Sequence, residues 1–440
     1  MPKSKQAYDR PVYIVDSSRT PFLKARTKPN PFSASDLAVF AGRDVLLRQP
    51  FDPKDLGEVV VGSVMPSSKE ANIARVISLR LGCGKTVPAW TVQRNCASGL
   101  QALDSAAQDI GNGRYELVLA GGTESMSQAP LLFNREATTW FAAWFNAKSW
   151  TQKLRLIFQL RPQFFMPVFA LLNGLTDHVV NLSMGQTAEN LAYRFNITRK
   201  EMDEFAVLSH QHLIQAQENN LLARIVPVYD ASNHCYTLDD GVRADSSVEK
   251  LATLKPNFDK KFGEVTAGNS SQITDGAAML LLASEEAVKK YQLPVLGRIV
   301  DTAWAGCDPA EMGLGPAYAS AQLLTKQKLS LSDIDYWEIN EAFAGQVIAC
   351  LKALDNADFC KEEVGLKDKL GMIDSHKLNI HGGAIAIGHP VGASGARLVH
   401  ELLHILKIKK AKRGIATLCI GGGQGGAMLI ENVDSSTGEA

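Results

Sequence analysis

Two stretches of this chain, one near its start and one near its end, carry the same local pattern. Residues 96–100 (CASGL) precede the strand-like residues 117–122 (LVLAGG), and residues 392–396 (GASGA) precede residues 415–422 (IATLCIGG). Strands that alternate with helices predict parallel βαβ units. We therefore expect two similar layered α/β halves that meet face to face, with one cysteine from each at the contact.

A second pair of segments supports the duplication. Residues 55–62 (DLGEVVVG) read like residues 333–340 (DIDYWEIN), and each leads into a strand-like run. The alternative is that these pairs are only glycine-rich βα turns, which occur in many unrelated α/β proteins.

The composition excludes several classes of protein. With 440 residues, of which 45% are hydrophobic and 21% charged, the chain can bury one or two substantial cores. Its 46 Lys and Arg balance its 46 Asp and Glu, so the overall charge does not indicate a nucleic-acid partner.

The seven cysteines follow no disulfide or metal-binding pattern. They are odd in number and form no CxxC pair or metal-ligand spacing, which favours reduced thiols and no metal site. Residues 1–10 (MPKSKQAYDR) lack the apolar stretch of a signal peptide, and residues 435–440 (SSTGEA) do not form a peroxisomal tripeptide. We therefore expect a cytoplasmic protein of bacterial type.

Cys96 is the strongest candidate for a reactive group. Apolar residues recur at helical spacing from 100 to 110, which places Cys96 at a helix start. The free backbone N–H groups and the positive dipole end found there lower a thiol pKa. A lone cysteine is more often an inert buried residue. His389 in GHP and Cys419 in CIGGGQG favour the reactive interpretation, because a nucleophilic thiol needs an acid/base beside it.

Motifs along almost the whole chain carry a family resemblance. They are residues 18–21 (SRTP), 95–99 (NCASG), 120–127 (AGGTESMS), 184–190 (MGQTAEN), 266–271 (TAGNSS), 275–278 (DGAA), 340–344 (NEAFA), 382–390 (GGAIAIGHP) and 419–425 (CIGGGQG). In this order they resemble the thiolase family, whose members cleave or form the carbon–carbon bond of 3-ketoacyl-CoA thioesters.

The resemblance implies a fold and a domain division. Thiolases have a duplicated α/β fold of five layers, αβαβα, with a loop domain inserted into the first half. On this pattern residues 1–127 form the N-terminal half, which residues about 274–294 complete. Residues 128–273 form the loop domain with CoA-binding elements, and residues 295–440 form the C-terminal half.

The family pattern also implies roles for five residues. Cys96 attacks and becomes acylated, and His389 is the base that holds it as a thiolate. Cys419 protonates the acetyl-CoA enolate and deprotonates the incoming CoA, a task that suits an ordinary thiol pKa near 8.5. Asn340 holds a water that binds the thioester oxygen together with His389. The backbone N–H groups of Cys96 and Gly421 bind the ketone oxygen. Taken alone, Asn340 and Glu341 favour a helix N-cap, and the neighbouring His389 and Cys419 motifs favour the site role instead.

Coenzyme A is expected as a co-substrate, with no permanently bound cofactor and no metal. The sequence has no phosphate-binding GxxxxGK[ST] loop. The resemblance places the pantetheine along Ser271, Arg243 near the nucleotide, and Met184 and Phe343 in the channel. For Arg243 the alternative is a solvated surface charge.

Two positions depart from the family pattern. His381 stands where many members carry Asn, so it is either a core histidine or a second imidazole that tunes the site. Ser183 stands where short-chain members commonly carry His, which counts against a specificity restricted to acetoacetyl-CoA.

The segment 131–183 is the largest addition to the compact family pattern. Between residues 140 and 175 it contains no acidic residue, four basic residues and nine aromatic ones: Trp140, Phe141, Trp144, Phe145, Trp150, Phe158, Phe164, Phe165 and Phe169. This composition suits contact with a membrane surface. From residue 146 on, the segment resembles the thiolase subunit of trifunctional β-oxidation complexes, which implies a hydratase/dehydrogenase α-subunit as a partner. The alternative is a buried lid or a homodimer interface.

The sequence therefore predicts a 3-ketoacyl-CoA thiolase that acts in fatty acid β-oxidation as a homodimer or a dimer of dimers. Its substrates would be 3-ketoacyl-CoA and CoA, with medium to long acyl chains. The alternatives are a biosynthetic acetoacetyl-CoA thiolase, a ketoacyl-synthase-type condensing enzyme and a non-catalytic acyl-CoA-binding scaffold. The cysteine at 419 counts against the condensing enzyme, which uses two histidines in its place.

Overall fold

The computed structural model describes residues 8–433. The end of the chain that we examined for a peroxisomal tripeptide, and the first seven residues of the segment examined for a signal peptide, lie outside this range. Within it, no helix combines the length and apolar character needed to cross a membrane.

A mixed sheet runs through the described part of the chain. Its strands follow the order β14-β15-β16-β13-β1-β12-β5-β3-β4, with β2 paired to β12. Their bounds are β1 (Val12–Arg19), β2 (Leu23–Lys24), β3 (Glu58–Gly62), β4 (Ala89–Val92), β5 (Leu117–Ser125), β12 (Thr274–Ser284), β13 (Gly297–Gly306), β14 (Tyr336–Ile339), β15 (Arg413–Ile420) and β16 (Gln424–Glu431). The strands of each half thus form a contiguous block, and β12 returns to the first block after a long excursion.

The two halves are built alike. In the first, β3 pairs in parallel with β4 and β5, and in the second β14 pairs in parallel with β15. A capped 3-10 turn precedes β3 at Pro53–Asp55, and another precedes β14 at Leu331–Asp333. The repeat predicted from the sequence therefore corresponds to a repeated structural unit.

The halves meet in two ways, of which only one was expected. Helices α3 (Ser98–Gly111) and α15 (Ser394–Ile408) pack against each other between the halves. In addition, β1 and β13 form a short antiparallel ladder, from Val12 with Ile299 to Ile14 with Gly297, which joins the two sheets into one. Sequence patterning did not indicate this edge contact, because pairing at a strand edge depends on backbone groups rather than side chains.

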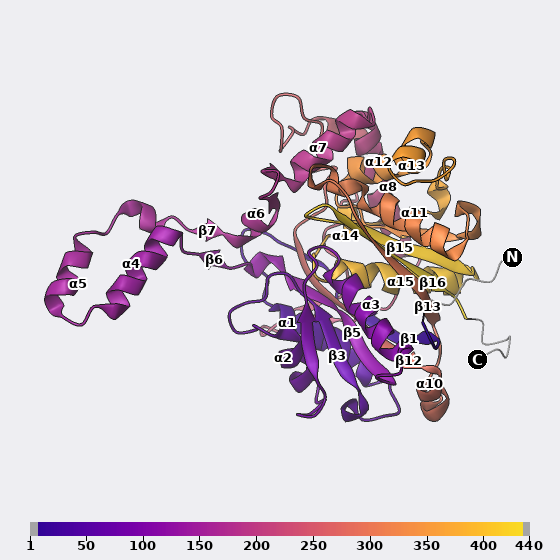
Figure 1. Cartoon of the computed structure of the whole chain (residues 1–440), viewed down its shortest axis with the longest axis horizontal. Helices are drawn as coiled ribbons and strands as arrows, with labels where there is room; N and C mark the ends of the chain where they lie inside the picture. Colours follow the sequence, from indigo (N-terminus) through magenta and orange to yellow (C-terminus); the bar gives the residue numbers. More distant parts are fainter. Residues whose placement is uncertain (1–7, 434–440) are drawn as a thin grey trace.

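Alternating side chains divide the core into layers. In β3, Val59 and Val61 face the helices on the outside, and Val60 faces the middle layer of α3 and α15. In β15, Ile415 faces the opposite outer helices and Ala416 faces the middle layer. The outer layers contain α1 (Ala34–Leu46), α2 (Ile73–Arg80) and α10 (Glu285–Tyr291) on one side, and α11 (Gly315–Gln327) and α12 (Ala344–Leu354) on the other. The expected five-layered αβαβα fold is therefore present (Figure 1).

Two glycines allow the middle helices to approach. A Cβ atom on Gly99 would lie 2.8 Å from the carbonyl oxygen of Gly392, and one on Gly395 would lie 2.4 Å from the backbone nitrogen of Leu100. Only glycine fits so close a backbone contact. The contact brings the N-termini of α3 and α15, and hence the loops before them, to one place.

Residues 128–273 lie outside the large sheet. They contain α4 (Arg135–Asn146), α5 (Trp150–Ile157), α6 (Ala170–Gly174), α7 (Met184–Arg194), α8 (Arg199–Glu218) and α9 (Val248–Ala252), with the ladders β6 (Leu131–Leu132) to β7 (Val168–Phe169), β8 (Thr176–Asp177) to β9 (Leu182–Ser183) and β10 (Val228–Tyr229) to β11 (Cys235–Tyr236). The C-terminal half adds α13 (Ala357–Glu362) and α14 (Ala384–Ile387). Short 3-10 turns lie at Met126–Gln128, Pro162–Phe165, Pro309–Leu314 and Ser375–Lys377. That 128–273 is a domain of its own stays a prediction.

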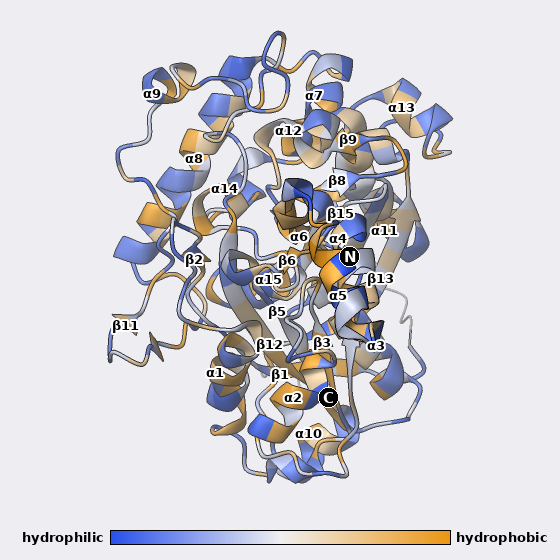
Figure 2. Cartoon of the chain, turned by 90° about the vertical axis from the view of Figure 1, so that its left-hand side faces the viewer, coloured by the Kyte–Doolittle hydropathy of each residue, from blue (hydrophilic) through white to orange (hydrophobic). Residues whose placement is uncertain are grey.

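Helices α4 and α5 form an arm, residues 133–167, that extends away from the body on the β6–β7 ladder (Figure 1), and Figure 2 looks along it from its tip. Phe145 is 83% exposed and Phe158 82% exposed. Trp140 and Trp144 instead stack on each other within the arm. The alternative of a buried lid is therefore wrong for the arm. Ala137 is the one residue of α4 and α5 that is buried, so these helices do not pack onto the body.

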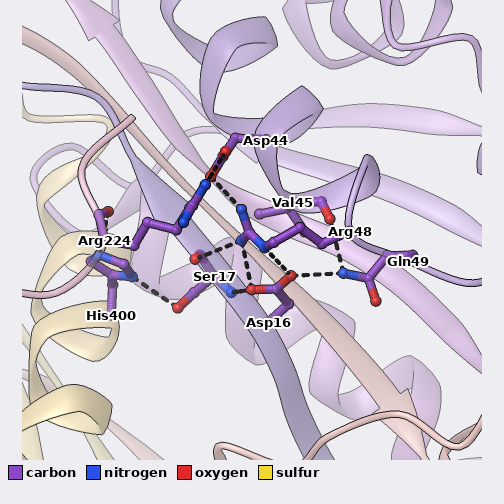
Figure 3. A network of polar contacts seen from close by, with 8 residues as sticks. All are labelled: Asp16, Ser17, Asp44, Val45, Arg48, Gln49, Arg224 and His400. Carbon is purple, nitrogen blue, oxygen red and sulfur yellow. Dashed lines mark hydrogen bonds and ion pairs between the residues drawn. The ribbon is translucent and has the colours of Figure 1, made fainter. Parts of the chain in front are cut away.

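A polar network ties both halves to the segment between them (Figure 3). Asp44 on α1 accepts hydrogen bonds from Arg48 and Arg224, and Arg48 also pairs with Asp16 on β1. His400 on α15 contacts the Ser17 hydroxyl at 2.9 Å and the Arg224 carbonyl at 3.1 Å. Although burial acts to raise the pKa of Asp44, these two guanidinium groups hold it well below its ordinary value.

Candidate active site

A cavity of about 530 Å³ lies between the body and residues 128–273. Its wall includes His389 and two other basic residues, Lys24 and Arg243. Burial lowers the pKa of Lys24, and the neighbouring Arg243 lowers it further. The cavity thus combines a basic region with an imidazole.

A second cavity of about 40 Å³ adjoins the first, and Cys96 lines it. The two cavities share four apolar wall residues, which are Met126, Leu175, Met184 and Val391. The Cys96 thiol and the His389 imidazole therefore face adjoining spaces, although the sequence separates them widely.

Cys96 lies in a tight turn before α3. Asn95 adopts a left-handed backbone with φ of 44°, and its side-chain amide donates to the Gly421 carbonyl at 2.7 Å. The Ser98 hydroxyl donates to the Asn95 carbonyl at 2.7 Å and closes the turn. The helix start expected for Cys96 is present, since α3 begins two residues later.

The helix start does not lower the thiol pKa as we expected from the sequence. The apolar surroundings of Cys96 raise its pKa, and backbone hydrogen bonds from Gly421 and from Cys96 itself offset this only in part. Desolvation disfavours the thiolate more than the exposed helix N–H groups favour it. Cys96 therefore needs a base to become a nucleophile.

The surroundings of His389 suit a base. Its Nδ1 lies 2.6 Å from the Ser394 hydroxyl, and this hydroxyl donates its own proton to the Pro390 carbonyl at 3.1 Å. The hydroxyl must then accept from Nδ1–H, so in the neutral ring Nε2 carries the lone pair. Burial, with a contribution from Arg397, lowers the pKa of His389 to about 4. The imidazole is therefore a neutral base at pH 7.

Asn340 follows β14 and reaches the same imidazole. Its side-chain Nδ2 lies 3.4 Å from His389 Nε2, and its backbone N–H donates to the Thr417 carbonyl at 2.9 Å. Its buried Oδ1 has no hydrogen-bond partner among the described residues, so it can accept from a ligand group. Asn340 is not a helix cap, because α12 begins four residues later with Phe343 at its N-cap.

Glu341 fixes this loop against the His389 loop. Its buried carboxylate accepts from the Ser209 hydroxyl at 2.6 Å, from the Asn379 amide at 2.8 Å and from the Ile385 backbone N–H at 3.2 Å. Three segments thus converge on one carboxylate behind the site, and the sequence motif NEAFA did not indicate this role.

Cys419 ends β15 and is buried. Burial raises its pKa well above the ordinary value, and the nearby thiols of Cys96 and Cys350 raise it further. The ordinary thiol pKa that the sequence argument used is therefore wrong for this residue. At pH 7 Cys419 is a protonated thiol close to Cys96, which suits a proton donor.

The turn after Cys419 is built from glycines for two reasons. Gly422 and Gly423 adopt left-handed backbones with φ of 95° and 78°. A Cβ atom on Gly421 would lie 3.2 Å from the Met184 sulfur. The turn can therefore present the Gly421 N–H towards Cys96 without a side chain between them.

The four residues assigned to CoA line the large cavity: Arg243, Ser271, Met184 and Phe343. Ser271 donates its backbone N–H to the Ala342 carbonyl at 2.9 Å, and the ring of Phe343 packs against Phe258. Arg243 is half-buried in the cavity wall, and its backbone N–H donates to His210 Nδ1 at 3.2 Å. Its contact with the nucleotide stays a prediction.

Comparison with known proteins identifies the family. The family model described as "Thiolase, N-terminal domain" matches residues 12–286, and the one described as "Thiolase, C-terminal domain" matches residues 293–432. The chain belongs to the thiolase family. It is an acyltransferase that uses CoA as a substrate without a permanent cofactor.

Named relatives extend over nearly the whole chain. The rat mitochondrial 3-ketoacyl-CoA thiolase is 39% identical over 96% of this chain and 98% of its own length. The bovine mitochondrial trifunctional enzyme subunit beta is 36% identical over 98% of this chain and 90% of its own.

Solved structures of enzymes with different names share this fold. The human mitochondrial 3-ketoacyl-CoA thiolase in complex with CoA has a TM-score of 0.83 and 36% identity, and the match covers 98% of this chain and all of that one. The acetyl-CoA acetyltransferase from Syntrophomonas wolfei has a TM-score of 0.84 and 31% identity, with 96% of this chain and all of that one covered. The family and fold predictions are confirmed, whereas the substrate is left open between these names.

The two departures from the family pattern have structural explanations in this thiolase. Ser183 caps α7, where its hydroxyl accepts from the Gln186 backbone N–H, and it also lines the large cavity. His381 is buried and its Nδ1 lies 2.7 Å from the Glu401 carboxylate. His381 lines neither cavity, so it is a core histidine.

Several site residues were missed from the sequence. Ser394, which orients His389, repeats Ser98 in the two matching segments, and this correspondence was the available signal. No sequence signal marked Leu171 and Leu175, because short apolar helices look alike in a sequence. Among residues 8–433 no group of three His, Cys, Asp or Glu side chains could hold a metal ion.

Proposed function

We propose that this thiolase catalyses the CoA-dependent cleavage of 3-ketoacyl-CoA to acetyl-CoA and a shortened acyl-CoA in fatty acid β-oxidation. The observation that carries the proposal is that Cys96 and the neutral imidazole of His389 line adjoining cavities, with the buried, protonated thiol of Cys419 close to Cys96. A retro-Claisen cleavage needs one nucleophile, one base and one proton donor, and these three groups can supply them.

In the first step, His389 Nε2 takes the proton of Cys96 while the sulfur attacks the ketone carbon of the substrate. The ketone oxygen becomes an oxyanion, which the backbone N–H groups of Cys96 and Gly421 stabilise by hydrogen bonds. Asn340 supports the thioester oxygen on the other side of the breaking bond through a water, and the protonated His389 donates to the same oxygen.

In the second step, the oxyanion collapses and the bond between the α and β carbons breaks. Its electron pair moves to the acetyl-CoA enolate, and the Cys419 thiol donates a proton to the α carbon. The acyl group stays on Cys96 as a thioester. The raised pKa of Cys419 suits this order, because the residue must arrive protonated.

The return half regenerates the enzyme. The Cys419 thiolate takes the proton of an incoming CoA thiol, and the CoA sulfur attacks the acyl-Cys96 thioester. Cys96 leaves as a thiolate and recovers its proton from His389. Each group thus ends in the protonation state in which it began.

Acetoacetyl-CoA thiolysis or synthesis is the second candidate, and the small cavity favours it. About 40 Å³ beside Cys96 suits an acetyl group better than a long chain. Steady-state thiolysis of 3-ketoacyl-CoA substrates from C4 to C16 separates the two. Activity that rises with chain length supports the β-oxidation enzyme, and activity confined to C4 supports the alternative.

We also propose that the arm contacts a hydratase/dehydrogenase subunit. Support comes from the acid-free stretch 140–175, from the exposed rings of Phe145 and Phe158, and from the relative named trifunctional enzyme subunit beta. A membrane surface would suit the same basic and aromatic composition. Pull-down with the hydratase/dehydrogenase subunit, beside sedimentation with anionic vesicles, distinguishes these partners.

A homodimer or a dimer of dimers and a cytoplasmic location complete the proposal. Reduced thiols suit the cytoplasm, and the seven cysteines form no disulfide in the described residues. Light scattering of the purified chain measures the oligomer, and cell fractionation measures the location. A monomer, or recovery of the protein from another compartment, would contradict these two proposals.

A further inference from the structure

One short helix closes the cavity beside Cys96. Leu171 and Gly174 of α6, with Leu175 directly after it, form part of the wall. The cavity volume of about 40 Å³ holds about three water molecules, since one needs roughly 10–15 Å³ by this measure. A long acyl chain needs more space than this cavity offers with the wall in its present position.

The acyl chain has to enter this cavity if the proposed thiolysis is correct. The phosphates of a CoA ester are drawn to Lys24 and Arg243, the two cations that line the large cavity besides His389. From there the pantetheine reaches His389, and the ketone carbon must stand at Cys96. The rest of the acyl chain lies beyond the ketone, on the side of Cys96 where α6 stands.

Most of the wall is fixed. Val64 and Met65 donate their backbone N–H groups to the buried Glu124 carboxylate at 2.8 and 3.1 Å. Met126 and Val391 are buried, with exposed fractions of 4% and 6%. Moving any of these residues would break a buried hydrogen bond or open the core, and both are costly.

Helix α6 is the weakly held part of the wall. None of its residues is buried, its N-terminus has no side-chain cap, and Leu172 is 60% exposed. Among the described residues, the backbone hydrogen bonds that tie its ends to other elements run from Ala170 to Pro130 at 3.2 Å and from Met184 to Leu175 at 2.9 Å. Elements with few buried contacts are the ones that open at low free-energy cost.

We propose that α6 is the movable wall of the acyl-chain pocket, and that Leu171 sets which chain lengths Cys96 accepts. With α6 closed the pocket accepts an acetyl-sized group, and with α6 displaced it accepts a long chain. Leu171 is the position to test, because it lines only the small cavity. Leu175 lines both the small cavity and the large one assigned to CoA. The inference rests on the thiolysis proposed above.

Variants at Leu171 test this wall. We compare kcat/KM for C4 and C16 3-ketoacyl-CoA in the wild type, Leu171→Ala and Leu171→Trp. Leu171→Ala should raise the ratio of C16 to C4 activity by about tenfold, and Leu171→Trp should lower it by a similar factor, because one methylene in an apolar pocket changes discrimination about 10- to 200-fold. Leu160→Ala is the matched control, since Leu160 lies on the arm outside both cavities, and its ratio should equal that of the wild type.

Hydrogen exchange tests the movement itself. The backbone amides of 170–175 should exchange faster in enzyme acylated with a C16 chain than in enzyme acylated with acetyl. Equal exchange in the two acyl-enzymes, or an unchanged C16 to C4 ratio in both Leu171 variants with C4 turnover retained, would overturn the proposal. A wild type without turnover on any chain length would instead overturn the proposed function.

Discussion

At the scale of single residues, one hydroxyl, that of Ser394, orients the His389 ring. Ser394 fixes the tautomer, and burial keeps the ring neutral, so His389 is in the state that the proposed first step requires. Cys419 shows the opposite effect, because burial raises its pKa and keeps the thiol protonated. The proposed base and the proposed acid are therefore both buried, and the pKa of each is moved in the direction that its proposed step requires.

The pH dependence of activity reports on His389. Its pKa is lowered to about 4, so the ring stays neutral as pH falls from 7 to 5 and becomes charged only near pH 4. We expect kcat/KM for C4 thiolysis to lose activity on the acid side near pH 4. An acid limb near the ordinary histidine value of about 6.5 would show that the ring is not held neutral. His389→Ala should remove this limb and slow alkylation of Cys96 by iodoacetamide at pH 7.

Replacement of Cys419 tests the proton donor. Cys419→Ser keeps the size of the side chain but offers a hydroxyl of much higher pKa, so turnover should fall about 10²- to 10⁴-fold. Iodoacetamide should still alkylate Cys96, because its base is intact. Cys350→Ser is the matched control, since that thiol is also buried near Cys419 but donates to the Gly313 carbonyl and takes part in no proposed step. Turnover above about a tenth of the wild type in Cys419→Ser would remove the assigned role.

At the scale of elements, the arm is stabilised by its own contacts and leaves part of its aromatic surface free. Trp140 donates its indole N–H to the Leu156 carbonyl at 2.9 Å, which ties α4 to α5. Trp144 and Phe164 are half-buried in the arm, so replacing them would disturb the arm itself. The most exposed rings of the arm are those of Phe145, Phe158 and Trp150, and Trp150 is 71% exposed. These rings are free to contact a partner.

Replacing Phe145, Trp150 and Phe158 with Ser should leave C4 turnover and the melting temperature unchanged and weaken binding to the partner subunit. The physical reason is that these rings contribute little to the fold, while buried aromatic anchors dominate binding energy at interfaces.

A triple variant of exposed aromatics outside the arm, Tyr193→Ser, Tyr229→Ser and Phe262→Ser, is the control and should bind as the wild type does. Loss of C4 turnover to the same extent as binding in the arm variant would show that the arm belongs to the core of the enzyme.

At the scale of the whole molecule, the duplication places the site. The two similar halves touch at the start of α3 and α15, and this contact carries the Cys96 turn and the loop of His389 to one point. The Ser98 and Ser394 hydroxyls both donate to a backbone carbonyl of the loop that precedes their helix.

A larger side chain at the contact should harm both stability and activity. Gly395→Ala would place a Cβ atom 2.4 Å from the Leu100 backbone nitrogen, so the helices must separate, at a cost of about 1–3 kcal/mol. We expect a lower melting temperature and lower C4 turnover. Gly306→Ala is the control, because nothing lies within 4 Å of its Cβ position. Equal melting temperatures and turnover for the two variants would contradict the role of this contact.

Much of this architecture could be predicted from the sequence, because repeated strand patterns and glycine-rich turns specify local structure. The raised pKa values of Cys96 and Cys419 could not be predicted, since both depend on burial by residues that are distant in the chain. The β1–β13 ladder and the α6 wall were also missed. Both depend on how completed elements meet, and a sequence pattern describes only each element by itself.

The central claim is that Cys96 carries the acyl group, and intact-mass measurement tests it most directly. Enzyme mixed with a 3-ketoacyl-CoA in the absence of free CoA should gain the mass of one shortened acyl group, mapped by peptide analysis to Cys96. Cys96→Ala should gain none. Acyl mass on another cysteine of the wild type, or acylation and turnover that persist in Cys96→Ala, would contradict the account.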